Sequence, residues 1–600
     1  MEYRNRDVAM GRRQRRGHFV SRLLRTGATG SILLLGLGLT FVGTALGLVV
    51  AQPASADASA LYAYATGGAI GPMNCPKTGA TSKQCTLGEA LSLAKAGSIV
   101  ALVTPGTAKH YVGNWTVTTS GTSSSVPLTI KPAPGVTNPV LDGNHGKRAG
   151  CQTAACNGPI LTIGSKVDVD LYRLTVQNAD NTYPLSPFGG AIQNHNGGTL
   201  SVSDCRFLKN TATEGGAIDQ TDGTLSVSGS SFTANTATGS AGTHAYDGGA
   251  IDNGDNSSGT VTVSGSTFTA NTAGHRASLG SAFAGGAIDN GDNGGTGTLT
   301  VSDSTFMGNT VLDCPGYCTS DGGAINNADN GGTGTLTVSG SSFTASFAHG
   351  GGAICNGTGG ASVSASTFTD NAADYGAAID NGDSGTGTLT VSGSTFTANR
   401  ATEDAGAIRN GSPTSTTGTV IVSASTFYGN SAAGKSNDPN IDTRGPNGYG
   451  GAIDNVATGT LVVSNSSFSA NTAKNGGGTI NNFHLVWATT DIFSGPCHEA
   501  AQGSWNDEGY NVGSDATCLN AGIGDVSHGA GHLGPLAHNG GPTETMLPLA
   551  TNPAVGVVPL NTTVKLSARS VMLCPTTDQR GVHSAGGKAC NAGAVQSSAP

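Results

Sequence analysis

Apolar and polar positions alternate in one phrase that recurs along most of the chain. A typical copy, residues 285–309, contains Gly-Gly-Ala-Ile, a polar linker, the run Thr-Leu-Thr-Val-Ser and the motif Phe-x-x-Asn. The apolar residues of the run have a period of two, which predicts a strand with one face directed inwards. Gly-Gly, Asn-Gly and Asp-Asn pairs between the runs predict turns.

The spacing inside the phrase is constant, although the copies differ in length. Nine copies place a Val five residues before the Phe, and these Phe residues are Phe207, Phe232, Phe268, Phe306, Phe343, Phe368, Phe396, Phe427 and Phe468. Longer copies insert residues only after Phe-x-x-Asn and after Ile-x-Asn. We therefore expect stacked strands joined by free loops at two corners.

These features predict an all-β chain folded as a right-handed parallel β-helix, in which one copy forms one coil. Right-handedness follows the usual crossover between parallel strands. Equivalent residues then form ladders of Val, Phe and Asn, and the Asn amides satisfy one another in the dry interior. Ahead of the repeats, the capping box Thr86-Leu-Gly-Glu89 predicts a short capping helix over residues 87–95, followed by a buried strand over residues 98–103.

The chain divides into four segments. Residues 1–56 combine a region with eight Arg, an apolar run over 32–51 and a small-residue site, which predicts a secretory signal cleaved after Ala56. If it is not cleaved, residues 32–51 are long enough to form a single N-terminal membrane anchor. We expect an N-terminal cap over 57–137, the β-helix over 138–482 and a C-terminal cap domain over 483–600.

Charge and cysteine content point to export. Without residues 1–56 the chain has 29 − 8 = 21 basic and 38 − 2 = 36 acidic residues, so its net charge of −15 excludes nucleic acid as a partner. Twelve Cys fit an oxidising compartment. The expected pairs are Cys75–Cys85, Cys151–Cys156, Cys314–Cys318, Cys497–Cys518 and Cys574–Cys590. Cys205 and Cys355 lie six repeats apart, roughly 29 Å along the coil axis, so we expect no bond between them.

Two columns of acids are candidate calcium ligands. Asp219, Asp252 and Asp289 follow the repeat Ile directly, and Asp222, Asp255 and Asp292 lie three residues further on. Stacked carboxylates about 5 Å apart repel one another, and a hard cation with oxygen ligands relieves that repulsion. The alternative is turn chemistry, in which Asp-Asn-Gly forms tight turns and solvent screens exposed carboxylates.

Other candidate sites have weaker patterns. A stripe of Thr, eight and six residues before the Phe, could order water or ice, or bind a glycan, although β-propensity on a solvated face explains it equally well. His528 and His532 lie in a Gly-rich stretch, where we expect loop residues and a metal role is the alternative. His195 and His349 are isolated in the sequence, so we expect surface residues. The N-x-D, D-D, G-H-G and R-x-K set of polygalacturonases is absent, and so is an Arg-rich pectate-lyase signature.

Gly-Gly-Ala-Ile with Phe-x-x-Asn resembles the repeat of the polymorphic outer membrane protein family over residues 189–482. QCTLGEALSLA, residues 84–94, is similar to the C-S-L-R-E-A-I segment of many secreted β-helix proteins, with Gly88 in place of Arg. GPLAHNGGPTETMLPL and DQRG resemble a C-terminal domain of bacterial surface proteins. The resemblance implies a pectate-lyase-like solenoid on the cell surface with a role in adhesion; the family's β-barrel is not apparent here.

Three functions remain open at this point. The first is a non-catalytic, secreted or cell-surface β-helix that presents its loops to an extracellular glycan or protein surface, since variable loops on a rigid scaffold suit recognition. The second is a polysaccharide lyase or hydrolase of the pectate-lyase-like class. The third is binding of ice or mineral by the Thr stripe. Insertions at 238–247, 274–284, 312–321 and 434–449 favour the first.

Overall fold

The computed structural model divides into two compact units, residues 1–56 and 57–600. It describes residues 60–65, 85–104, 110–118, 126–144, 158–182, 188–195, 197–238, 246–254, 257–274, 283–312, 320–329, 331–382, 385–412, 417–434, 448–456, 458–529, 532–583 and 589–596. The predicted signal therefore lies outside the described residues. Within the described ranges, the search for a helix with the length and apolarity of a membrane span found none.

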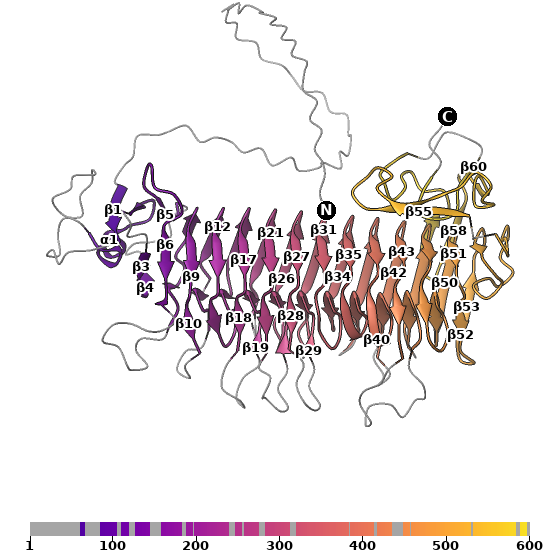
Figure 1. Ribbon diagram of the computed structural model, residues 1–600, viewed down its shortest axis with the longest axis horizontal. Coiled ribbons are helices and arrows are strands. Elements are labelled where there is room, and N and C mark those ends of the chain that lie inside the picture. Colours follow the sequence, from indigo (N-terminus) through magenta and orange to yellow (C-terminus); the bar gives the residue numbers. More distant parts are fainter. Residues whose placement is uncertain are drawn as a thin grey trace, which may run out of the picture. The chain divides into compact units, whose positions relative to one another are not determined.

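Three long parallel sheets run the length of a β-helix, and one strand of each makes up a typical coil (Figure 1). We call these three sheets A, B and C. Along the chain, a strand of sheet C is followed by one of sheet A and one of sheet B, as in β20 (Ile251–Asn253), β21 (Thr260–Ser264) and β22 (Thr267–Thr269). The predicted right-handed parallel β-helix is confirmed.

Sheet A has fifteen strands: β1 (Ala60–Tyr64), β2 (Ile99–Val103), β5 (Leu128–Pro132), β8 (Val169–Tyr172), β12 (Thr199–Ser203), β16 (Thr224–Ser228), β21 (Thr260–Ser264), β26 (Thr298–Ser302), β31 (Thr335–Ser339), β34 (Gly360–Ser364), β38 (Thr388–Ser392), β42 (Thr419–Ser423), β46 (Thr460–Ser464), β50 (Leu485–Thr489) and β53 (Ser504–Asp507). Sheet B has fourteen: β3 (His110–Val112), β6 (Val140–Asp142), β9 (Thr175–Gln177), β13 (Arg206–Leu208), β17 (Ser231–Thr233), β22 (Thr267–Thr269), β27 (Thr305–Met307), β32 (Ser342–Thr344), β35 (Thr367–Thr369), β39 (Thr395–Thr397), β43 (Thr426–Tyr428), β47 (Ser467–Ser469), β51 (Ile492–Ser494) and β54 (Val512–Gly513). Sheet C has thirteen: β4 (Trp115–Val117), β7 (Leu161–Ile163), β11 (Ile192–His195), β15 (Ile218–Thr221), β20 (Ile251–Asn253), β25 (Ile288–Asn290), β30 (Ile325–Asn327), β33 (Ile354–Asn356), β37 (Ile379–Asn381), β41 (Ile408–Asn410), β45 (Ile453–Asn455), β49 (Ile480–Asn482) and β52 (His498–Glu499).

Short strands form smaller sheets beside the three long ones. In the sequence, each short strand comes after the sheet B strand of its coil. One contains β10 (Asp180–Asn181), β14 (Thr211–Ala212), β18 (Thr236–Ala237), β23 (Thr272–Ala273) and β28 (Thr310–Val311). A second contains β19 (Tyr246–Asp247), β24 (Phe283–Ala284) and β29 (Ser320–Asp321), and a third contains β36 (Ala372–Tyr375), β40 (Arg400–Asp404), β44 (Ser431–Ala432) and β48 (Thr472–Ala473). They follow Phe-x-x-Asn, one of the two corners at which the sequence predicts insertions.

Side-chain ladders hold the coils in register, as the repeat predicts. From Phe207 to Phe468 the nine rings stack with centroids 4.7–4.8 Å apart. In the Phe-x-x-Asn ladder, Asn235 Nδ2 donates to Asn271 Oδ1 at 2.9 Å. In the Ile-x-Asn ladder, Asn253 Nδ2 donates to Asn290 Oδ1 at 2.6 Å. Each coil therefore satisfies the buried amides of the next coil in the dry core.

A third ladder was not predicted. From Phe232 to Phe468, the residue two positions before each Phe is a buried Ser. Its hydroxyl accepts from the backbone N–H of the equivalent residue one coil earlier, as Ser266 Oγ does from Ser230 at 3.1 Å. Ser304 Oγ accepts from Ser266 in the same way at 3.1 Å. The sequence shows this Ser in most copies, but Ser also suits an exposed turn, so its burial is visible only in the structure.

A helix covers the N-terminal end of the coil. Helix α1 (Leu87–Leu93) begins with the predicted capping box of Thr86 and Glu89 and packs Leu87, Ala90 and Leu91 into the core. It ends two residues earlier than predicted because Ala94 has extended dihedral angles. The expected buried strand is β2, Ile99–Val103. Sheet A also continues beyond the range expected for the repeats, from Ala60 to Asp507.

The C-terminal segment packs on the outer face of sheet B. Three antiparallel pairs form it: β55 (Leu533–Ala537) with β56 (Thr545–Pro548), β57 (Val558–Pro559) with β60 (Ala589–Cys590), and β58 (Thr563–Leu566) with β59 (Arg569–Met572). Its contacts lie on the last coils, where Ala594 N–H donates to Ser467 Oγ at 3.0 Å. Thr395 and Thr426 of sheet B are buried there, whereas Thr267 and Thr305 at the same register are exposed.

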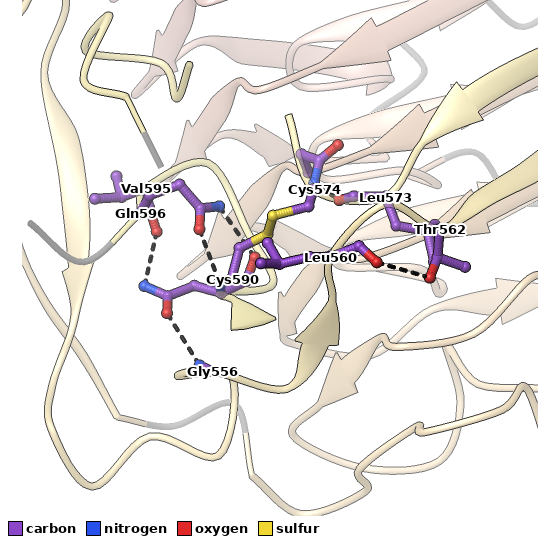
Figure 2. The surroundings of a disulfide bond; sticks show 10 residues. Gly556, Leu560, Thr562, Leu573, Cys574, Cys590, Val595 and Gln596 are labelled. Carbon is purple, nitrogen blue, oxygen red and sulfur yellow. Dashed lines mark hydrogen bonds between the residues drawn. A yellow bond between two sulfur atoms is a disulfide. The ribbon is translucent and has the colours of Figure 1, made fainter. Parts of the chain in front are cut away.

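Two of the predicted disulfides are confirmed, Cys497–Cys518 and Cys574–Cys590. Figure 2 shows the surroundings of the second disulfide, with Cys574, Cys590 and Gln596 labelled. Here Asn591 N–H donates to Gln596 Oε1 at 2.8 Å and ties Gln596 to the end of β60. Cys85 is also disulfide-bonded, but its predicted partner lies outside the described residues, as do the other two predicted pairs. The disulfides indicate an oxidising, extracellular environment.

Cys205 and Cys355 are buried on different coils and belong to no disulfide, as expected. Burial raises the pKa of Cys205 to about 12, so its thiol is not ionised at neutral pH.

Candidate functional site

The long insertions share one corner of the coil. Strands β18 and β23 precede the insertions 238–247 and 274–284, while β19 and β24 form the last two residues of these insertions. The two leading strands are paired with each other, and so are the two following strands. The described ends of these insertions therefore lie on one edge, as the sequence predicts.

Three consecutive coils lack a long insertion at that corner. Their connections are residues 347–350, 372–375 and 400–404, between the insertions at 312–321 and 434–449. The β36–β40 pair lies in this stretch and contains a register shift between Ala373 and Tyr375. A cluster of chemically reactive side chains occurs here, which we call the corner cluster: His349, Asp374, Tyr375, Asp380, Thr402, Glu403 and Arg409.

Asp374 is held by side chains from two other coils. His349 Nδ1 lies 2.9 Å from Asp374 Oδ2, and the hydroxyl of Thr402 donates to Asp374 Oδ1. The side chains of His349 and Asp374 are 27% and 29% exposed, so the pair is accessible to solvent. Burial acts to raise the pKa of Asp374, but the hydrogen bonds from His349 and Thr402 outweigh it and lower this pKa. Asp374 is therefore an ionised acceptor at neutral pH.

Glu403 has a different environment. The hydroxyl of Tyr375 donates to Glu403 Oε2, and the residue as a whole is only 4% exposed. Burial, together with the negative charges of Asp374 and Asp404, raises the pKa of Glu403. The same burial and the Glu403 contact raise the pKa of Tyr375, which keeps its hydroxyl protonated.

Arg409 fixes the ring of Tyr375. Its guanidinium carbon lies 4.4 Å from the ring centroid, and its Nη1 donates to Asp380 Oδ2 at 3.1 Å. The Arg409 and Asp380 side chains are 7% and 0% exposed. The edge of His349 meets the same Tyr375 ring at 5.4 Å between centroids. A buried ion pair and an aromatic contact thus set the orientation of the phenol that holds Glu403.

The corner cluster was missed in the sequence because its members lie outside the repeated phrase. His349 was expected to be an isolated surface residue. Its side chain is 27% exposed, but it is not isolated, because coil stacking brings Asp374 and Tyr375 to it from 25 and 26 positions away. His195 is also not isolated, since its Nε2 lies 2.5 Å from Asp219 Oδ2. Burial acts to lower the pKa of His195, but the hydrogen bond and the negative charge of Asp219 outweigh it and raise this pKa.

The first predicted acidic column exists, and it is buried. Asp219, Asp252 and Asp289 are in register on neighbouring coils and no more than 1% exposed. This burial does not fit the alternative of exposed turn carboxylates for this column. The next member, Asn326, donates from Nδ2 to Asp289 Oδ1 at 2.8 Å, so an amide takes up part of the negative charge.

The second predicted column is less regular. Asp222 is exposed and accepts from the backbone N–H of Ser258 at 3.1 Å, whereas Asp292 is buried. Asp255 lies outside the described residues. Across the ranges that the structure describes, no group of three or more His, Cys, Asp or Glu side chains has an arrangement that could hold a metal ion. Calcium binding by these columns stays a prediction, which a calcium-dependent rise in melting temperature would support.

The threonine stripe lies on the outer face of sheet A, as predicted. Thr260, Thr298 and Thr335 are in register and exposed. Gly360 takes the next position and interrupts the stripe before Thr388. His528 and His532, in the C-terminal segment, are exposed.

No protein-family model matches the chain, and no curated protein matches it either.

Proposed function

We propose that this protein is a secreted or cell-surface β-helix protein that attaches to an extracellular glycan at the corner cluster. The proposal includes export by residues 1–56 and a repeat of the polymorphic outer membrane protein type. The disulfides support the extracellular location, and the stacked parallel sheets fit the repeat.

The observation that carries the proposal is the set of polar side chains at the insertion-free corner. His349 and Asp374, whose side chains are 27% and 29% exposed, supply polar groups, and the half-buried Tyr375 lies beside them. A sugar ring presents the complementary chemistry, with hydroxyl groups around its rim and C–H groups on its faces. A few fixed polar groups beside an aromatic ring are typical of small-ligand sites.

The charges favour a neutral glycan over a polyuronate. Within the corner cluster the permanent cation is Arg409, and Asp380 already neutralises it. Asp374, Glu403 and the adjacent Asp404 make the surroundings negative, so a chain of uronates would be repelled. Neutral hexose and N-acetylhexosamine polysaccharides are therefore the expected ligands.

Binding of the purified protein to immobilised polysaccharides tests the proposal. Tyr375→Ala and Asp374→Ala should each weaken retention at least about tenfold, equivalent to about 1.4 kcal/mol. Asp370→Asn is the matched control, because Asp370 pairs with Arg400 on the same two coils but its side chain is 49% exposed and lies outside the cluster. Equal retention of all four proteins, or no retention of any neutral polysaccharide, would refute the proposal.

A further inference from the structure

Asn-Gly pairs recur along the chain, and eight of them lie within the described residues. This dipeptide is chemically labile, because Gly has no side chain to obstruct the attack of its backbone nitrogen on the carbonyl carbon of the Asn side chain. Five of the eight pairs belong to the Ile-x-Asn ladder, where the Asn is fully buried: Asn253-Gly254, Asn290-Gly291, Asn356-Gly357, Asn381-Gly382 and Asn410-Gly411.

The stacked coils hold both reacting groups of each ladder pair. The Asn Nδ2 donates to the Asn Oδ1 of the next coil at 2.6–3.0 Å. The Gly N–H, whose nitrogen would attack, donates to a backbone carbonyl of the preceding coil at 2.7–3.0 Å. Ring closure would have to break both bonds inside the core, so these five pairs react only when the coil opens.

The pair Asn293-Gly294 lies outside the ladder, in the turn from Asp292 to Gly295. Gly295 N–H donates to Asp292 O at 2.7 Å, and φ is 49° at Asn293 and 88° at Gly294, so both central residues are left-handed. Asn293 is half-buried and Gly294 is exposed. Within the part of the chain that the structure describes, Gly294 N–H donates no hydrogen bond. This turn can therefore open without disturbing a ladder.

The remaining two described pairs are held more firmly. Asn475-Gly476 packs against His498, because a side-chain carbon built on Gly476 would lie 3.2 Å from that ring. At the third pair, Asn539 Nδ2 donates to the backbone carbonyl of Thr545 at 2.7 Å and lies 3.2 Å from its hydroxyl. Among the described Asn-Gly pairs, Asn293 therefore has the least restrained reaction partner.

We propose that Asn293 deamidates spontaneously in the folded protein, which makes this turn a modification site independent of glycan binding. The deprotonated Gly294 nitrogen attacks Asn293 Cγ and closes a cyclic imide. The bond from Cγ to Nδ2 breaks, and ammonia leaves with the proton that the Gly294 nitrogen lost. Water, the one co-reactant, then opens the imide at either of its carbonyl groups, which gives aspartate or isoaspartate.

Either product changes the turn. Aspartate adds a carboxylate next to Asp292, which is fully buried. Isoaspartate also lengthens the main chain by one carbon atom. The turn stacks on its equivalents in the neighbouring coils: Thr296 N–H donates to Ser257 O at 2.7 Å, and Thr333 N–H donates to Gly295 O at 2.9 Å. We therefore expect the longer main chain to weaken coil stacking at this corner.

Incubation of the purified protein at mildly alkaline pH, followed by tandem mass spectrometry that separates Asn293 from Asn290, tests the proposal. Asn293 should gain about 1 Da as its amide becomes a carboxyl group. The gain should be at least about tenfold faster than at the five ladder pairs, which depend on coil opening. The matched control is the same protein unfolded in urea, where the ladder pairs lose their protection and should react as fast as Asn293. Asn293→Gln should remove the gain at this turn.

Three outcomes would overturn these claims. If Asn293 stays intact in the folded protein while the unfolded protein deamidates, the turn is not a modification site. If the ladder pairs of the folded protein react as fast as Asn293, the stacked coils give no protection. A faster gain at Asn475 or Asn539 than at Asn293 would assign the modification to a different turn.

Discussion

Gln579 accepts a hydrogen bond from Thr426 at 2.6 Å, although 153 residues separate them in the sequence. Its amide Nε2 also donates to Thr395 Oγ1, one coil earlier, at 2.9 Å. Gln579 belongs to the DQRG stretch and Thr543, which also accepts from it at 2.9 Å, belongs to the GGPT stretch. Through these two stretches the C-terminal segment is hydrogen-bonded to sheet B.

Loss of the Gln579 hydrogen bonds should weaken the packing of the C-terminal segment on sheet B. Gln579→Ala leaves Thr395, Thr426 and Thr543 without their shared partner in a buried contact, which should cost about 1–3 kcal/mol. Urea denaturation followed by fluorescence measures the loss, and limited proteolysis should release the C-terminal segment faster. Lys565→Ala, an exposed position on β58, is the control and should change stability by no more than about 0.5 kcal/mol. Identical urea midpoints for Gln579→Ala and wild type would show that the contact is not stabilising.

Ser346 interrupts the Phe-x-x-Asn ladder, and its repair should stabilise the coil. Asn371 and Asn309 are the members on either side, and the buried hydroxyl of Ser346 has no hydrogen-bond partner within the described residues. Asn271 Nδ2 donates to Asn309 Oδ1 on the next coil. Ser346→Asn would offer Asn309 Nδ2 an equivalent amide oxygen to donate to. The variant should gain about 1 kcal/mol, read as a higher melting temperature.

The control for this ladder is Ser342→Asn, because Ser342 lies on the outer face of the same coil. This variant should have nearly the wild-type melting temperature. A Ser346→Asn protein that melts at or below the wild-type temperature would mean that the shorter connection at 347–350 leaves no room for the amide.

Asp525 should make stability depend on pH. Burial and the carboxyl group of Asp507 raise the pKa of Asp525 to about 7, while backbone N–H groups of Asn511 and Gly522 act against this rise. Since the usual pKa of Asp is about 4, the folded state binds the proton more tightly than the unfolded state. The resulting stability is fully present below pH about 4 and is lost as the pH rises to about 7.

Asp525→Asn mimics the protonated form at all pH values. It should match wild type at pH 4 and exceed it at pH 8 in urea midpoint, whereas Asp303→Asn on an earlier coil should follow wild type throughout. If Asp525→Asn is instead less stable than wild type at pH 8, the charged Asp525 is stabilising and the sign of the argument is reversed.

The core could be derived from the sequence because every coil repeats it. Val263 and Phe268 lie over Val301 and Phe306 in the register that their constant spacing predicts. The capping helix was equally predictable, since Thr86 and Glu89 form their contacts within one turn. The acidic column was predicted in position but not in burial, because the spacing within one coil does not show which segments cover it.

The sequence by itself determined the coil, its register and the corner that carries the insertions, because each rests on local spacing repeated many times. The tertiary structure alone decided the corner cluster and the Gln579 contact. Their members, such as His349 and Glu403, follow no repeat and stand 54 positions apart, and they meet only because successive coils stack about 4.8 Å apart. The energy of coil stacking is shared by many residues. The sequence pattern of one coil therefore cannot show which individual side chains of the neighbouring coils will face it.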